Sequence, residues 1–122
     1  MKLKLFDEQL SVCKISGVGN VDFTRELTFV GITDEEISLV CPTSFAPAET
    51  MEREDGWRAF RVQEGELDFS LVGILAKISE ALADAGVPIF AVSTYNTDYI
   101  LVKADMLNRA TEALANAGYE VI

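Results

Sequence analysis

The sequence has no histidine, only two cysteines and three prolines, and half as many basic as acidic residues. Without histidine, and with no second cysteine close to Cys13 or Cys41, the chain cannot form the usual zinc sites or a Cys–His nucleophile. Both cysteines lie inside apolar, strand-like runs, so we expect buried, reduced thiols. The sequence therefore predicts neither a bound metal nor a cofactor.

Long hydrophobic runs are also missing. No apolar stretch approaches the length that crosses a bilayer, and the opening MKLKLF, followed by Asp7 and Glu8, lacks the apolar region of a signal peptide. We therefore expect a cytoplasmic protein. Ten basic residues against twenty acidic ones give a formal net charge of −10. Binding to nucleic acid or to an anionic membrane needs surface Lys and Arg, so the charge predicts that neither is a partner.

The length of 122 residues, about half of them hydrophobic, suits one compact domain or two small ones that share a core. The acidic segment 52–56 (EREDG) is the expected internal boundary. We therefore expect an N-terminal half over residues 1–56 and a domain over residues 57–122.

The second half contains two amphipathic helices. Apolar residues recur at helical spacing from Leu71 to Ala85 and again from Met106 to Ala117. Gly86 and Gly118 can supply the left-handed residue that ends each helix, and the possible N-caps are Asp68 or Ser70 for the first and Asp105 for the second. Both helices end in similar strings, EALADAG and EALANAG.

Strands surround these helices at residues 57–62, 87–93, 99–102 and 119–122, and a polar turn, 94–98, joins the middle two. The order strand, helix, strand, strand, helix, strand predicts an α+β, ferredoxin-like βαββαβ unit: an antiparallel sheet with both helices on one face. The first half reads as a degenerate copy of this order. It has strands at 10–15, 27–32 and 37–41, a hairpin turn at 33–36 and a short helix within 43–52. Both halves need the strand 57–62, so they either share one sheet or exchange strands.

The segment LDFSLVGILAKISEALADAGVPIFAVSTYNTDYILV, residues 67–102, resembles the ACT domain. The resemblance is to the branch of small bacterial tandem-ACT proteins that includes the animal cytosolic arginine sensor and is related to the regulatory region of aspartate kinase. It is densest from Asp68 to Val102 and weaker at residues 41–42 and 57–58. It implies a regulatory module that binds amino acids, usually at an interface between two ACT units, and therefore a homodimer or higher homo-oligomer.

The resemblance also implies where the ligand binds: the loop before the first helix and the adjacent strand, residues 68–74 and 92–98. Asp98 matches the ligand-contacting aspartate of the arginine sensor. The loop departs from the D-x-P-G pattern common in the family, because it reads D-F-S-L-V-G. The candidate ligand-binding residues are Asp68, Ser70, Leu71, Val72, Gly73, Ile74, Ser93, Thr94, Tyr95, Thr97 and Asp98.

The chemistry of these residues suits a free amino acid. Amides of Leu71, Val72 and Gly73 at a helix start stabilise a carboxylate. Asp98, with Asp68, suits an ammonium or a guanidinium, which favours cationic and small polar amino acids. The alternative is structural: Asp68 or Ser70 only caps the helix, and Asp98 is only a turn residue.

We therefore expect a non-catalytic regulatory protein that binds an amino acid and acts through oligomerisation or a partner. One alternative is a ligand-free structural or interaction module, and another is an orphan regulatory subunit of an amino-acid biosynthetic enzyme such as aspartate kinase. An enzyme is disfavoured, because the chain has no P-loop, no dinucleotide-binding glycine pattern and no paired base and nucleophile.

Overall fold

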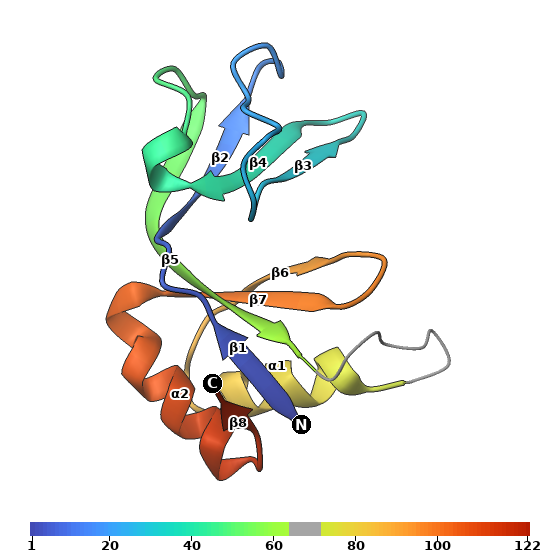
Figure 1. Cartoon of the computed structure of the whole chain (residues 1–122), viewed down its shortest axis with the longest axis vertical. Coiled ribbons are helices and arrows are strands. Elements are labelled where there is room, and N and C mark those ends of the chain that lie inside the picture. The colour runs from blue at the N-terminus through green and yellow to red at the C-terminus, as the bar shows by residue number, and fades with distance from the viewer. Residues whose placement is uncertain (64–71) are drawn as a thin grey trace. The chain divides into compact units, whose positions relative to one another are not determined.

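The computed structural model describes residues 1–63 and 72–122, which form two compact units (Figure 1). One unit combines Met1–Asp7 with Arg58–Ile122, and the other is Glu8–Trp57. We call them the C-terminal and N-terminal units. The division lies beside the expected boundary after residue 56, but the first seven residues belong with the C-terminal half of the chain.

The C-terminal unit has the predicted ferredoxin-like order. Its described sheet runs β8–β1–β5–β7–β6, and its helices are α1 and α2. The bounds are β1 (Lys2–Leu5), β5 (Glu52–Val62), α1 (Ile74–Asp84), β6 (Phe90–Ser93), β7 (Asp98–Lys103), α2 (Leu107–Asn116) and β8 (Glu120–Val121). Of β5, only the part from Arg58 to Val62 belongs to this unit. A short 3-10 helix, Ala104–Met106, precedes α2.

The strand β1 was not predicted, and it is inserted between the first and last strands of the βαββαβ order. Leu3 lies opposite Val62 in the antiparallel pair with β5, and opposite Val121 in the parallel pair with β8. The Leu3 side chain is fully buried. The insertion therefore extends the expected four-stranded sheet by one strand.

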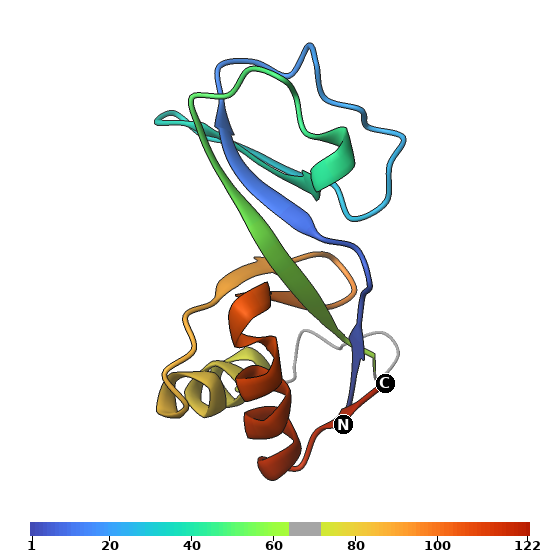
Figure 2. The ribbon, with the colours of Figure 1, turned by 90° about the vertical axis from the view of Figure 1, so that its left-hand side faces the viewer.

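Both helices pack on one face of this sheet, as predicted, and they contact each other (Figure 2). Successive side chains of a strand point to opposite faces of the sheet, so every second strand residue faces the helices. The fully buried core there combines strand residues with helix residues: Leu3, Phe60, Val62, Ile100 and Val102 with Ile78, Leu82, Ala110 and Leu114. No helix in the described part of the chain is long and apolar enough to cross a membrane.

The N-terminal unit keeps the ferredoxin-like strand order without the helices. Its strands run β3–β4–β2–β5, and every neighbouring pair is antiparallel. The bounds are β2 (Leu10–Ile15), β3 (Phe29–Ile32), β4 (Ile37–Pro42) and the first part of β5. The predicted helix within residues 43–52 is only a 3-10 turn, Thr43–Phe45, because Pro42 and Pro47 leave too little chain between them.

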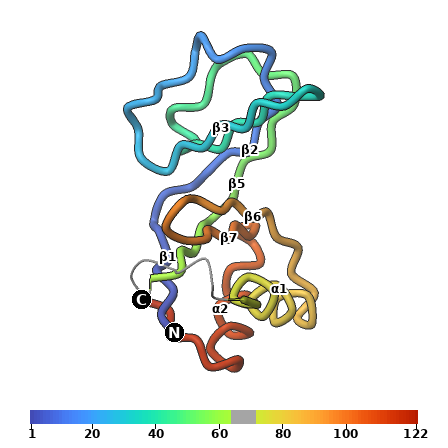
Figure 3. The backbone as a smooth tube through the Cα atoms, turned by 90° about the vertical axis from the view of Figure 1, so that its right-hand side faces the viewer, coloured from blue at the N-terminus to red at the C-terminus, as the bar shows by residue number. Residues whose placement is uncertain are grey.

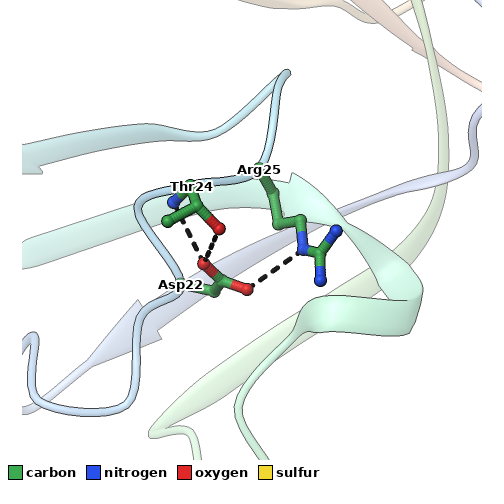
Figure 4. Close-up of polar contacts among 3 residues, drawn as sticks. All are labelled: Asp22, Thr24 and Arg25. Carbon is green, nitrogen blue, oxygen red and sulfur yellow. Dashed lines mark hydrogen bonds and ion pairs between the residues drawn. The ribbon is translucent and has the colours of Figure 1, made fainter.

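A loop replaces the first helix of the N-terminal unit, and a local turn organises it (Figure 4). The Asp22 carboxylate accepts bonds from the Thr24 amide at 3.0 Å and the Thr24 hydroxyl at 2.5 Å. It also pairs with Nε of Arg25 at 3.0 Å. These bonds, that of the Thr24 hydroxyl foremost, lower the pKa of Asp22. Local side-chain bonds of this kind compete with helix formation, which explains the loop.

A single long strand explains why both halves required residues 57–62. β5 begins at Glu52, so the acidic segment 52–56, the expected internal boundary, is part of a strand. Its first part pairs with β2, from Glu52 to Trp57, and its last part pairs with β1 (Figure 3). The segment is exposed, but backbone pairing in a sheet does not require apolar side chains.

The helix ends were predicted better than the helix starts. Gly86 and Gly118 have φ angles of 74° and 96°, which confirms the left-handed ends. The first helix begins three residues later than predicted, after Gly73, and Gly73 is its N-cap with no side-chain bond. The second helix has Met106 at its N-cap, so Asp105 does not cap it. The proposed caps Asp68 and Ser70 lie outside the described residues.

Candidate functional site

The β6–β7 hairpin carries the S-T-Y-N-T-D string, and hydrogen bonds close its turn tightly. The Thr94 amide donates to the Thr97 carbonyl at 2.8 Å, and the Thr94 hydroxyl donates to the same carbonyl at 3.1 Å. The Thr97 hydroxyl donates to the carbonyl of Val62 at 2.8 Å. The turn is therefore attached to the end of β5.

The hairpin presents its polar side chains on two faces of the sheet. Because Ile100 and Val102 pack against the helices, the alternation along β7 places Asp98 on the helix side and Tyr99 on the opposite side. On the helix side, the Ser93 hydroxyl donates to Oδ1 of Asp98 at 2.6 Å. These two residues are register partners, so the bond runs directly across the hairpin.

A cavity of about 290 Å³ lies against the turn and the end of β5. We call it the Arg61 pocket. The described residues that line it are Arg61, Val62, Gln63, Thr94, Asn96, Thr97 and Tyr99. The Arg61 guanidinium donates through Nε and Nη2 to Oε1 of Gln63, at 2.9 and 2.7 Å.

A smaller cavity of about 180 Å³ lies at the start of α1. We call it the helix-start pocket, and its lining comes from three segments: Met1, Val72, Gly73, Ile74, Lys77 and Tyr119. Gly73 has a φ of 81°, so the chain enters the helix through a left-handed residue. The Lys77 amide bonds to the Gly73 carbonyl at 3.0 Å. The amides of Ile74, Leu75 and Ala76 precede this first intrahelical bond and have no partner inside the helix.

The structure distributes the described candidate residues over three places. Thr94 and Thr97 line the Arg61 pocket, and residues 72–74 line the helix-start pocket. Ser93 and Asp98 form their pair on the helix side, and Tyr95, at 74 % exposure, stands at the turn. Asp68, Ser70 and Leu71 lie outside the described residues.

Sequence reasoning did not single out Arg61 or Gln63 for a site. Asn96 lies within the implied range 92–98 but was not among the named candidates, and Tyr99 follows that range directly. Arg61 stands between buried Phe60 and Val62 in the WRAFRV strand, which indicates a side chain on the face away from the core. That signal shows the face but not the cavity, because the cavity needs a turn more than thirty residues later in the chain.

The two cysteines lie in the N-terminal unit and are buried, as expected. Burial raises the pKa of both thiols, that of Cys41 to about 11, where the nearby Cys13 adds to the rise and Arg53 opposes it. A thiol with this pKa is protonated at neutral pH, so it is a poor nucleophile and a poor metal ligand.

Comparison with solved structures identifies proteins of the same fold. A protein of Agrobacterium tumefaciens is similar, with a TM-score of 0.88 and 29 % identity over 99 % of this chain and 91 % of that one. A Vibrio cholerae protein of unknown function, described as a possible transport protein, has a TM-score of 0.73 at 18 % identity, over 95 % and 88 % of the two chains. The regulatory subunit of aspartate kinase from Thermus thermophilus has a TM-score of 0.65 at 15 % identity, over 95 % and 96 %.

A family model matches the chain directly. It describes the ACT domain and aligns with residues 52–116, which is more than half of the 122 residues. The match runs from the start of β5 to the end of α2 and thus includes both helices, the hairpin and the Arg61 pocket. Together with the ferredoxin-like strand order of the C-terminal unit, this match shows that the chain belongs to the ACT domain family.

Proposed function

We propose that this ACT protein is a non-catalytic regulatory module that binds a free amino acid. One observation carries the proposal: the Asp98 carboxylate is held on the helix side of the hairpin by an uncharged partner. The Ser93 hydroxyl bonds to Oδ1, and no cation among the described residues forms an ion pair with Asp98. A positioned carboxylate without a counter-ion suits an ammonium or a guanidinium.

The start of α1 supplies a complementary group for the ligand carboxylate. The first amides of a helix have no intrahelical partner and stabilise an anion. In this chain they begin at Ile74, and Gly73 leaves the backbone accessible beside them. We therefore assign the carboxylate of the ligand to the first turn of α1 and its cationic group to Asp98.

Similar proteins support a regulatory role over a catalytic one. The structural likeness to the protein of Thermus thermophilus shows the fold, and that protein is named as the regulatory subunit of aspartate kinase. The resemblance of the S-T-Y-N-T-D string to the arginine sensor places cationic amino acids first among the ligands, followed by small polar ones. An orphan subunit of a biosynthetic enzyme such as aspartate kinase is the alternative form of the same role.

We further propose that the protein is a homodimer or a higher homo-oligomer. β6 pairs with β7 alone among the described strands, which makes it an edge strand, and edge strands are common sites of pairing with another chain. Light scattering after size exclusion, at high micromolar concentration, tests this proposal. We expect at least twice the 13.4 kDa of the chain, and a monomeric mass contradicts it.

A thermal-shift screen of the free amino acids tests the function. At ligand concentrations near one hundred times the dissociation constant, binding to the folded state adds about 2.7 kcal/mol to the free energy of unfolding. We expect a rise in melting temperature with at least one cationic or small polar amino acid. If no amino acid changes the melting temperature at millimolar concentration, the ligand-free interaction module is the better account.

A further inference from the structure

The Arg61 pocket lies on the other face of the sheet from Asp98 and is not used by the function proposed above. Phe60 and Val62 point into the core beneath the helices, so Arg61, between them, points to the opposite face. Tyr99 lies on that same face by the alternation along β7. At about 290 Å³, the pocket is at the lower end of the sizes that hold small molecules, roughly 300 Å³ and above.

The Arg61 side chain is held in place without a carboxylate. One edge of its guanidinium is bonded to Gln63, and its central carbon lies 5.0 Å from the Phe6 ring centroid and 5.9 Å from that of Tyr99. Two bonds to one oxygen and two aromatic neighbours restrict the rotamers of a long side chain. The guanidinium is thus oriented before any ligand arrives, which lowers the entropy that binding must remove.

The charge of Arg61 is not neutralised within the described chain. Arg25 pairs with Asp22 and Arg53 pairs with Asp55, but no described carboxylate pairs with Arg61. A guanidinium stays charged at any physiological pH, so the pocket keeps a full positive charge on its wall.

A second cation lies directly across from the first. Lys4 is the register partner of Arg61 in the β1–β5 pair, and its Nζ lies 4.9 Å from the same Phe6 ring. Like charges that face each other across antiparallel strands destabilise the pair. An anion bound to Arg61 in the pocket offsets one of these two charges, so the pair favours an anionic ligand.

The turn contributes a hydrogen-bond acceptor to the lining of the pocket. The Thr97 hydroxyl uses its proton on the Val62 carbonyl, so its oxygen can only accept from a ligand. A ligand that fits both ends has a carboxylate for Arg61 and a hydroxyl or ammonium donor for Thr97.

We propose that the Arg61 pocket binds a small organic acid, with Arg61 as the residue that binds its carboxylate. The pocket is separate from the Asp98 side of the hairpin, and this proposal does not depend on amino-acid binding there. Inorganic phosphate offers the same negative charge to Arg61, so the experiment must separate the two anions.

Titration of the ¹⁵N-labelled full chain, followed by NMR, tests the site with defined probes. Sodium acetate and sodium phosphate are titrated separately, with sodium chloride keeping the ionic strength constant. We expect acetate to cause saturable shifts at the Arg61 Nε–Hε signal and at the amides of Gln63 and residues 94–97. Arg61→Gln should weaken acetate binding about tenfold or more, because a charge-assisted bond is lost.

Arg109→Gln is the matched control, since it removes the same charge from an exposed position on α2. It should leave acetate binding unchanged. Arg61→Lys should give an intermediate affinity, because lysine keeps the charge but cannot form the two parallel hydrogen bonds that a guanidinium donates to a carboxylate. If Arg61→Gln fails to fold, the wild-type and Arg109→Gln titrations still show whether acetate causes saturable shifts at Arg61.

Three results overturn the proposal. Shifts that do not saturate, or that spread equally over all arginines, indicate charge screening only. Saturation by phosphate but not by acetate contradicts a carboxylate site. Shifts at Arg61 that follow protein concentration without any probe show that a second copy of the chain occupies the pocket.

Discussion

The hydroxyl of Thr97 donates a hydrogen bond of 2.8 Å to the backbone carbonyl of Val62, and this bond attaches the β6–β7 turn to the end of β5. It connects two parts of the chain that both line the Arg61 pocket. This side-chain bond therefore helps to position the turn, in addition to the bonds within the turn itself.

Thr97→Val should lower the free energy of unfolding by about 1–2 kcal/mol, because the partly buried carbonyl of Val62 loses its partner while the side-chain shape is kept. Thr97→Ser keeps the hydroxyl and should cost less. Urea denaturation measures both. Equal stabilities of Thr97→Val and the wild type would show that the bond does not form in solution.

Leu3→Ala should lower the free energy of unfolding by about 2–5 kcal/mol, because Leu3 is fully buried in the core beneath the helices. Asp7→Ala, an exposed change two residues after the same strand, should cost no more than about 0.5 kcal/mol. The same denaturation experiment measures this pair. A small effect of Leu3→Ala would contradict the insertion of β1 between β5 and β8.

The sequence predicted the ferredoxin-like order because that order depends on local signals. Two helical stripes, each ended by a glycine, and a polar hairpin turn are readable within short windows. The insertion of β1 was missed because Lys2–Leu5 has only two apolar positions, and its partners lie about sixty residues and more away. Pairing at that distance is decided by tertiary packing and not by a local pattern.

The same distinction explains what was predicted of the sites. The turn chemistry of Thr94 and Thr97 is local, and the sequence pointed to both residues. The role of Arg61 was missed because its pocket combines the end of β5 with a turn that begins at Thr94. The placement of Asp98 and Tyr99 on opposite faces follows from alternation along β7, but only once Ile100 is known to be in the core.

Gly86→Ala should lower the free energy of unfolding by about 1 kcal/mol, because Gly86 has a φ of 74° at the end of α1, a conformation that a Cβ disfavours. The structure leaves open space around both Gly86 and Gly17, and Gly17 has no positive φ. Gly17→Ala is therefore the control and should not destabilise the protein. Similar losses in the two variants would show that the backbone conformation is not the cause.

Because the Cys41 thiol is buried, the free energy of unfolding should decrease as the pH rises above 9. Burial, with Cys13 nearby, raises the pKa of Cys41 from 9.0 to about 11 in the folded protein. Between these values the unfolded chain has lost a proton that the folded chain still holds, so the contribution of Cys41 is present below pH 9 and lost as pH rises towards 11.

Urea denaturation from pH 8 to pH 11 tests this dependence. The free energy of unfolding should decrease with pH more steeply in the wild type than in Cys41→Ala, which lacks the thiol. Equal slopes would place the Cys41 thiol in contact with solvent.

Isothermal titration of the wild type and Asp98→Asn, with the amino acid that the thermal-shift screen identifies, tests the central claim most directly. Asn keeps the shape of Asp but removes the charge, so the affinity should fall about ten- to a hundredfold, the loss of a charge-assisted bond of roughly 1.5–3 kcal/mol. Asp34→Asn, in the exposed turn of the β3–β4 hairpin, removes the same charge and should bind like the wild type. Equal affinities of Asp98→Asn and the wild type, with equal melting temperatures, would contradict the assignment of Asp98 as the residue that binds the cationic group of the ligand.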